Sequence, residues 1–248
     1  MSGVVLPSNF KIENVSFKEP KKNTVGGQSV LLNYTYPDKK NGPLIMQTPK
    51  MRMPFGPDAS DTDTGAKKYS INTTLANDDN PNQNLQLFTE IIRSLDQKTK
   101  DFAAENSELW FGKTQKPDVL EEFYKSAEKK SKNDKYPSTL KLKLPVKAGD
   151  KPVPQFDIYN DNKELVNIVE DGGIDLSCLQ KGGEVVAIIQ CTGVWFVGKT
   201  QFGLGWKVVQ LKTFKNQKLV GYSIIDDDPE EVEEEEEEEV EEEDEEIG

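Results

Sequence analysis

The alternation of apolar and polar residues divides the chain into short strands, a helical stretch and further strands. Between residues 10 and 74, apolar-polar segments are separated by Gly, Pro and Asn, which is typical of a meander of strands. We predict strands over residues 10–17, 29–36, 44–48 and 67–74. From Leu85 to Phe102, apolar residues then recur at helical spacing. Asn80 followed by Pro81 predicts the start of this helix.

A second, shorter helix is predicted from Pro117. Strands resume near Leu140, where apolar residues alternate with lysines, a pattern that predicts one buried face and one basic face. Residues 185–192 suit a fully buried strand, and a further strand is predicted over 206–214. The whole pattern favours a mainly β fold, namely an oligonucleotide-binding (OB) type barrel with a helical insertion at about residues 80–130.

Charge divides the chain after residue 225. Residues 226–248 hold eighteen of the forty-four Asp and Glu residues and no Lys or Arg. Residues 1–225 contain the remaining twenty-six acidic residues and all thirty-one Lys and Arg, so they carry a net charge of about +5, while the whole chain carries −13. A run of like charges cannot bury enough surface to offset its ordering entropy. We therefore expect an OB-like body over 1–225 and a disordered acidic tail over 226–248.

The acidic tail is expected to compete for the basic body. A tethered polyanion reaches an effective concentration in the millimolar range next to a basic surface. Autoinhibition that nucleic acid relieves is the interpretation this favours, and improved solubility is the simpler alternative.

The composition weakens most enzyme hypotheses. The chain contains no histidine, which removes the commonest general base and any Ser-His or Cys-His pair. We interpret Cys178 and Cys191 as free intracellular thiols that cannot complete a structural zinc site. No apolar run approaches the ~18 residues that cross a bilayer, and the first ten residues do not look like a signal peptide. We expect no enzyme, no cofactor, no metal and no membrane.

Gly193 to Thr200 matches the phosphate-loop pattern G-x-x-x-x-G-K-T. In a phosphate loop a helix follows and its N-terminus holds the phosphates. Here the following residues lead into a strand pattern, and the four intervening residues are bulky and apolar. We interpret the segment as a hairpin; a nucleotide-hydrolysing enzyme built on Lys199 and Thr200 is the alternative.

Aromatic residues interleaved with lysines favour single-strand binding, because bases stack on rings while lysines neutralise phosphates. If the strands around residues 52 and 68 pair, their basic and aromatic residues meet on one surface. The predicted nucleic-acid-binding residues are Lys50, Arg52, Phe55, Lys67, Lys68, Tyr69, Trp110, Lys113, Lys141, Lys143, Trp195, Phe196, Lys199, Phe202, Trp206 and Lys207. For any single aromatic residue, a place in the core is the alternative.

Four short motifs support this prediction. They are QTPKMRMPFG at 47–56, KY at 68–69, WF at 110–111 and FGLGWK at 202–207. Together they resemble those of the single-stranded-DNA-binding proteins of nucleocytoplasmic large DNA viruses, which are distantly similar to the replication single-strand binders of short-tailed phages. The resemblance implies an OB-type barrel, no catalytic activity, and an acidic tail that contacts replication proteins and competes with DNA.

The end of the tail departs from that resemblance. The tail of the phage relatives ends in an aromatic residue, whereas this sequence ends in Ile247-Gly248. Val232, Val240 and Ile247 are the candidate apolar anchors for a partner in its place.

The sequence therefore predicts a non-enzymatic single-stranded-DNA-binding protein of viral DNA replication, recombination or repair. Its expected partners are single-stranded DNA, viral replication proteins bound by the tail, and further copies of itself. The resemblance implies a location inside an infected host cell, in the nucleus or a cytoplasmic viral factory, or in the virion. The alternative is a chaperone or scaffold that binds basic proteins through the acidic tail.

Overall fold

The computed structural model describes residues 3–22, 27–38, 40–61, 67–76, 81–133, 135–147, 149, 152–170 and 173–214. All of them belong to one compact unit, Met1–Asn216. The predicted acidic tail, with Val232, Val240 and Ile247, lies outside the described residues. The division at residue 225 therefore stays a prediction.

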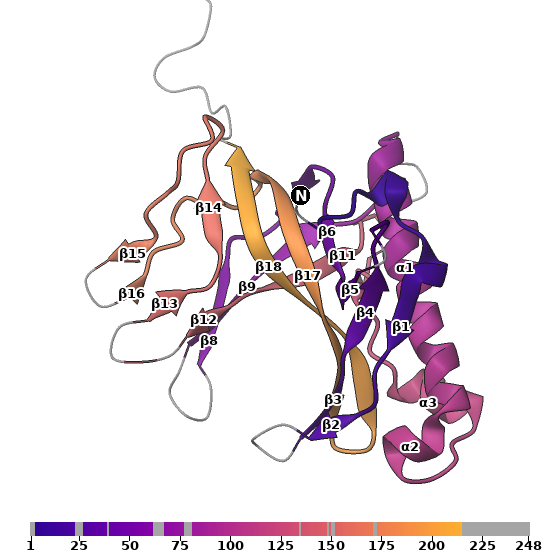
Figure 1. Cartoon of the computed structure of the whole chain (residues 1–248). Helices are drawn as coiled ribbons and strands as arrows, with labels where there is room; N and C mark the ends of the chain where they lie inside the picture. The colour runs from indigo at the N-terminus through magenta and orange to yellow at the C-terminus, as the bar shows by residue number, and fades with distance from the viewer. Residues whose placement is uncertain are drawn as a thin grey trace, which may run out of the picture. The chain divides into compact units, whose positions relative to one another are not determined.

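The described chain is mainly β, with its α-helices gathered in one stretch (Figure 1). The helices are α1 (Gln83–Glu105), α2 (Ser107–Phe111) and α3 (Pro117–Phe123), and two 3-10 turns, η1 (Pro7–Asn9) and η2 (Ile12–Asn14), lie near the N-terminus. The strands before the helices are β1 (Val15–Phe17), β2 (Lys21–Lys22), β3 (Gln28–Val30), β4 (Leu32–Thr35), β5 (Asn41–Pro43), β6 (Ile45–Gln47), β7 (Met51–Arg52), β8 (Asp58–Asp61) and β9 (Lys67–Thr74). The strands after them are β10 (Glu128–Lys129), β11 (Thr139–Leu144), β12 (Val146–Lys147), β13 (Val153–Pro154), β14 (Asp157–Tyr159), β15 (Val169–Glu170), β16 (Gly173–Ile174), β17 (Glu184–Val197) and β18 (Gln201–Phe214).

The long antiparallel pair β17–β18 forms the centre of the main sheet. Strands β3, β6 and β7 pair with β17, while β11 and β14 pair in parallel with β18. The main path runs β2-β3-β17-β18-β11-β9-β8, and the smaller sheets are β1-β4-β5, β12-β13 and β15-β16. The main sheet is therefore assembled on one hairpin.

The main sheet brings β7 close to β9. The Thr74 hydroxyl of β9 donates a hydrogen bond of 3.3 Å to the carbonyl oxygen of Arg52 in β7. No backbone ladder joins these two strands among the described residues. The prediction of a mainly β fold is confirmed, whereas a closed barrel is not shown.

The helices lie between β9 and β11, in the region where the sequence predicts an insertion. Helix α1 buries Leu85 and Phe88 on its apolar face, as predicted, but its N-cap is Asn82, whose side chain accepts from the Leu85 amide at 3.1 Å. The predicted cap, Asn80, lies outside the described residues. Helix α3 begins at Pro117, as predicted. The sequence does not predict α2, because five residues are too few to show a period.

A buried carboxylate fastens the segment after α3 to α1. Asp96 accepts hydrogen bonds from the Tyr124 hydroxyl at 2.6 Å, the Ala127 amide at 3.0 Å and the Ser126 hydroxyl. Burial raises the pKa of Asp96 above its ordinary value, while these donors oppose the shift. The donors replace the water that this carboxylate loses on burial.

The strand predictions were most accurate where alternation is regular. The strand predicted over 67–74 is β9, whereas 29–36 is broken at Leu31 into β3 and β4, and 10–17 contains η2 and only the short β1. The last strand begins at Gln201 and not at 206, so Gly203 lies inside it. Strands β8 and β14 are not predicted, since three or four residues carry too little pattern.

Gly203 allows the chain after α3 to lie against β18. The Lys125 amide donates to the Phe202 carbonyl at 2.7 Å. A Cβ at position 203 would overlap the Lys125 carbonyl oxygen and lie 3.0 Å from the Trp195 ring. The glycine thus removes a side chain at the point where two backbones and an indole meet.

We expect Gly203→Ala to lower the free energy of unfolding by about 1 to 3 kcal/mol, because the methyl group overpacks this contact. Chemical denaturation monitored by tryptophan fluorescence measures the change. Gly173→Ala is the matched control, since its Cβ would meet nothing within 4 Å, and it should stay within about 0.5 kcal/mol of the native protein. Equal stability of the two variants would contradict this account.

Candidate nucleic-acid interface

Strand β11 has one buried and one basic face, as predicted. Leu140, Leu142 and Leu144 are buried, whereas Lys141 and Lys143 are exposed. The leucines belong to the main core, so the strand cannot turn over without losing that burial. The core therefore fixes both lysines on the solvent side.

Lysines of three neighbouring strands share this side, and we call them the basic face: Lys68 of β9, Lys141 and Lys143 of β11, and Lys207 of β18. Lys143 is in register with Lys207 and, on its other side, with Ser70, which lies two residues after Lys68. Although Lys143 is exposed, partial loss of water around its ammonium group lowers its pKa, and the charges of Lys68 and Lys141 lower it further. These cations therefore repel one another, and an anion would relieve that repulsion.

An acidic residue partly offsets this charge. Lys141 Nζ lies 3.7 Å from a carboxylate oxygen of Asp58 in β8. Both side chains are about half exposed, at 41% and 53%, so this ion pair is screened by water. The pair can open at little cost when a phosphate approaches Lys141.

A β-bulge brings Lys212 onto the side of Lys207. In a regular strand, residues five positions apart lie on opposite faces. Here Ile188 pairs with Gln210 and Ile189 pairs with Val208, which leaves one extra residue in β18. Val208 and Leu211 are buried at 0% and 1%, so both lysines lie on the opposite, solvent side.

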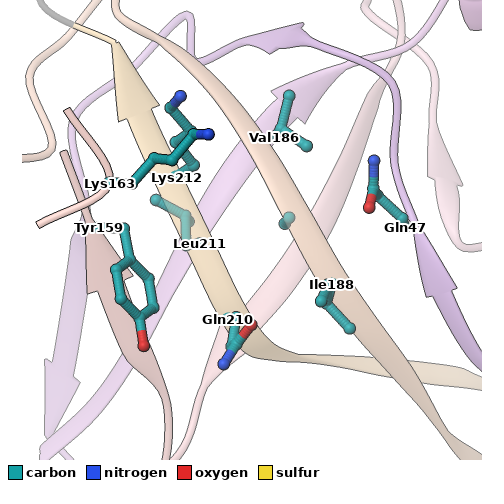
Figure 2. A pocket seen from close by; sticks show the side chains of 9 residues that line it. Gln47, Tyr159, Lys163, Val186, Ile188, Gln210, Leu211 and Lys212 are labelled. Carbon is teal, nitrogen blue, oxygen red and sulfur yellow. The ribbon is translucent and has the colours of Figure 1, made fainter. Parts of the chain in front are cut away.

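Beyond the bulge, a groove of about 290 Å³ crosses β17 and β18, and we call it the Tyr159 groove. Figure 2 shows Tyr159 and Lys163 on one side of β18, and Val186, Ile188 and Gln47 on the other. Its lining is Gln47, Tyr159, Lys163, Val186, Ala187, Ile188, Gln210, Leu211 and Lys212. The groove thus combines an apolar floor with one aromatic ring, two cations and two amides.

Lys163 reaches this groove with a left-handed backbone, at φ 66°. Its amide donates to the Asn160 carbonyl at 3.0 Å, and the Asn160 side chain accepts from the Glu164 amide at 2.9 Å. For a residue with a side chain this conformation costs roughly 1 kcal/mol or more. A strained residue at a ligand-sized groove points to a role for its side chain.

Phe214, at the end of β18, lies between two cations. Lys212 Nζ is 5.0 Å and Lys50 Nζ 4.1 Å from the centre of its ring. Lys50 also forms an ion pair of 3.1 Å with Glu184. Lys50, Arg52 and Phe55 line a second cavity, of about 890 Å³, which we call the Phe55 pocket.

The strand pairing on which a joint patch of residues 50–55 and 67–69 depended does not occur. Strand β7 pairs with β17, not with β9, and Arg52 meets the Thr74 end of β9. Lys67 is seven residues from that end, roughly 23 Å along an extended strand. Tyr69, moreover, packs against the core.

Three predicted stacking residues are buried in the core. Trp110, Phe202 and Trp206 are 3%, 0% and 2% exposed. The Trp110 ring centre lies 6.2 Å from that of Phe202 and 5.5 Å from that of Phe196, which is half-buried. Trp110 and Phe202 hold α2 against the β17–β18 hairpin, and neither they nor the buried Trp206 offer an open face to a base. Trp195, also half-buried, packs beside Gly203.

Two predicted lysines lie at the far end of the hairpin. Lys113 follows α2, and Lys199 is exposed in the turn between β17 and β18, where Gly198 has a φ of 58°. Lys199 is eight residues from Lys207, about 26 Å along an extended strand. Since two paired strands flank this turn, the hairpin interpretation of the G-x-x-x-x-G-K-T segment is confirmed.

Sequence reasoning missed four residues of this surface: Tyr159, Lys163, Lys212 and Phe214. Lys212 and Phe214 belong to the predicted last strand, but only the bulge places Lys212 beside Lys207. Tyr159 and Lys163 come from a strand of three residues and the turn after it, which carry no periodic signal.

The cysteines take no part in this surface. Burial raises the pKa of Cys191 to about 12 and also raises that of Cys178, so both thiols resist ionisation. Within the described ranges, Asp, Glu and Cys form no group of three that could hold a metal ion. In the same ranges, no helix is both long and apolar enough to cross a membrane.

Solved structures with some similarity come from bacteriophages. Gp2.5, a single-stranded DNA binding protein encoded by bacteriophage T7, is 14% identical with a TM-score of 0.45, over 78% of this chain and 97% of that one. The single-stranded DNA-binding protein from bacteriophage Enc34, in complex with ssDNA, is 13% identical with a TM-score of 0.43, over 82% and 98%. The structure of the same protein without DNA is 13% identical with a TM-score of 0.43, over 85% of this chain and 96% of that one.

Sequence comparison gives a family. No curated protein matches the sequence. The model of a family of unknown function, DUF5871, matches residues 72–231, which contain α1, the β17–β18 hairpin, and Lys141, Lys143 and Lys207 of the basic face. Because this match spans more than half of the chain, the protein belongs to the family of unknown function DUF5871.

Proposed function

We propose that this protein binds single-stranded DNA, with little sequence preference, along the basic face and the Tyr159 groove. The observation that carries the proposal is that the basic face and the Tyr159 groove are continuous. The bulge in β18 places Lys207 of the basic face and Lys212 of the groove on the same side of the sheet. Lysines neutralise phosphates without reading sequence, and the Tyr159 ring with its apolar floor offers faces for unpaired bases.

The dimensions of the groove favour a single strand over a duplex. A groove of about 290 Å³ accepts side groups the size of a base. The bases of a duplex are stacked inside the helix, whereas those of a single strand can be splayed onto a protein surface. Gln47 and Gln210 provide amide groups that can bond to any base, which agrees with weak sequence preference.

The strands β7, β17, β18, β11 and β9 fit a partly open OB-type barrel in this proposal. The supporting contact is the hydrogen bond from Thr74 to Arg52, where the two sides of the sheet approach. OB-type barrels bind single strands across such a strand face. The phage proteins described above bind single-stranded DNA according to their names, and the proposal extends that ligand to this chain on the strength of its own lysines and groove.

The acidic tail completes the proposal. Its eighteen carboxylates compete with DNA for the basic face, and its apolar residues bind replication proteins. The viral source, the roles in replication, recombination and repair, self-association and the location in an infected cell or virion stay predictions of the sequence resemblance.

Fluorescence anisotropy of labelled oligothymidylate tests this proposal. The full chain should bind, and log affinity should fall by about 0.7 per neutralised phosphate for each tenfold rise in salt. A chain ending at Ile225 should bind more tightly at low salt, because the competing polyanion is absent. Absence of binding by both forms would refute the proposal and favour the chaperone or scaffold that binds basic proteins. Equal affinity of the two forms would refute tail competition alone.

Lys163→Gly separates binding from stability. The glycine relieves the left-handed strain, so the free energy of unfolding should stay equal or rise. DNA affinity should fall, and the salt slope should decrease by about 0.7, because one phosphate contact is lost. Thermal denaturation and salt-dependent anisotropy measure the two effects. A variant with unchanged affinity and slope would remove Lys163 from the interface.

Lys143→Arg should extend binding to higher pH. In the free protein the pKa of Lys143 is lowered, and a bound phosphate would raise it. Affinity is therefore complete below the free-protein pKa and falls as pH rises through it. The substituted arginine stays charged over this range. Anisotropy at a series of alkaline pH values should show the loss of affinity in the native chain and a smaller loss in the variant. Identical pH profiles would contradict a phosphate contact at Lys143.

A further inference from the structure

The Phe55 pocket combines exposed rings with positive charge. Phe55 is 58% and Tyr136 67% exposed, although aromatic rings of this size are usually covered. Four cations also line the pocket, namely Lys50, Arg52, Lys129 and Lys130, against one carboxylate, Glu184. Its volume of about 890 Å³ lies within the range of ligand sites in proteins.

Secondary structure fixes the walls of this pocket. On one side, Arg52 of β7 is in register with Glu184 of β17. On the other side, Lys129 of β10 is in register with Thr139 of β11. Strand β10 is held by Glu128, which accepts two hydrogen bonds from Arg93, at 2.8 and 3.0 Å. The cations of the pocket therefore lie on paired strands or next to them.

Carboxylates of the protein offset only part of the positive charge in the pocket, since the charge of Lys130 acts on Glu128, which is already bound to Arg93. Lys50 forms the ion pair with Glu184. Within the described part of the chain, Arg52, Lys129 and Lys130 form no ion pair. An anionic ligand would complement this charge, and the two rings call for a ligand that also has flat apolar faces.

The pocket and the Tyr159 groove are joined by one short row of side chains. Lys212 lines the groove, and its ammonium lies 5.0 Å from the Phe214 ring. Lys50 lies 4.1 Å from the same ring and lines the pocket. A strand that leaves the groove therefore meets a cation, an aromatic ring and a second cation before it reaches the pocket.

We propose that the Phe55 pocket is a second nucleotide-binding station on the same DNA strand. Phe55 and Tyr136 stack on bases, while Arg52, Lys129 and Lys130 bind phosphates. This inference rests on the proposed function, since the strand reaches the pocket from the Tyr159 groove. The acidic tail is the less suitable occupant, because carboxylates use the cations but leave both rings without a partner.

The dependence of affinity on oligonucleotide length tests the second station. We would use the full chain with labelled oligothymidylates of about 4 to 16 nucleotides, the range of sites in OB folds. The native chain should show a second rise in affinity once the strand spans both stations. The double variant Phe55→Leu/Tyr136→Leu should lack that rise and bind long strands roughly fivefold or more weakly, with short strands unaffected. Tyr159→Leu, the matched control, should weaken binding at every length.

The possible outcomes separate this inference from the function it rests on. A double variant that keeps the second rise would overturn the second station and leave single-strand binding intact. A native chain that binds no oligonucleotide would overturn both. Circular dichroism checks the fold, which exposed substitutions should preserve. As a second readout on the native chain, photo-crosslinking of strands that contain 5-iodouracil should label peptides with Phe55 or Tyr136, and labelling confined to Tyr159 would also overturn the inference.

Discussion

The antiparallel pairing of β17 with β18 is the constraint on which the rest of the structure depends. Among the described residues, five other strands pair directly with these two. Their register decides which side chains face the core, because a shift by one residue exchanges the two faces of a strand. The single extra residue at the bulge makes such a shift halfway along β18. The solvent side of the sheet thereby gains a second lysine while Leu211 stays buried.

The same hairpin explains why binding and packing are assigned to different aromatic residues. At its turn end, Phe202 and the neighbouring rings anchor the helical insertion. At its other end, Phe214 lies among lysines. An aromatic residue in a strand is therefore a core residue or a surface residue according to what covers that stretch of strand: rings of the insertion cover Phe202, whereas lysines flank Phe214.

The regular spacing of apolar residues predicted the features that depend on one β-strand or one helix alone. The alternation around Lys141 and Lys143 is sufficient to define a basic face, because three leucines bury the other side. Proline and helical spacing were likewise sufficient for α1 and α3. These features need only local information and a core to bury against.

The remainder of the surface depends on contacts between distant segments. The Tyr159 groove requires β14 to pair in parallel with β18, and it requires a bulge that leaves no periodic trace in the sequence. The condition for residues 52 and 68 to share one surface is not met, because β7 pairs with β17 and not with β9. The indole of Trp110 was assigned to DNA because neither α2 nor its contact with the hairpin can be inferred from a five-residue segment.

The left-handed turn at Lys163 has a consequence for how this family evolves. Stability alone favours glycine or asparagine at such a position. If selection acted on folding alone, a mutation of Lys163 to either residue would be tolerated. Under the function proposed above, the long basic side chain of Lys163 offsets this cost by contacting a phosphate. Loss of DNA binding in the groove would remove that gain, so glycine or asparagine is expected at this turn in relatives that no longer use the groove.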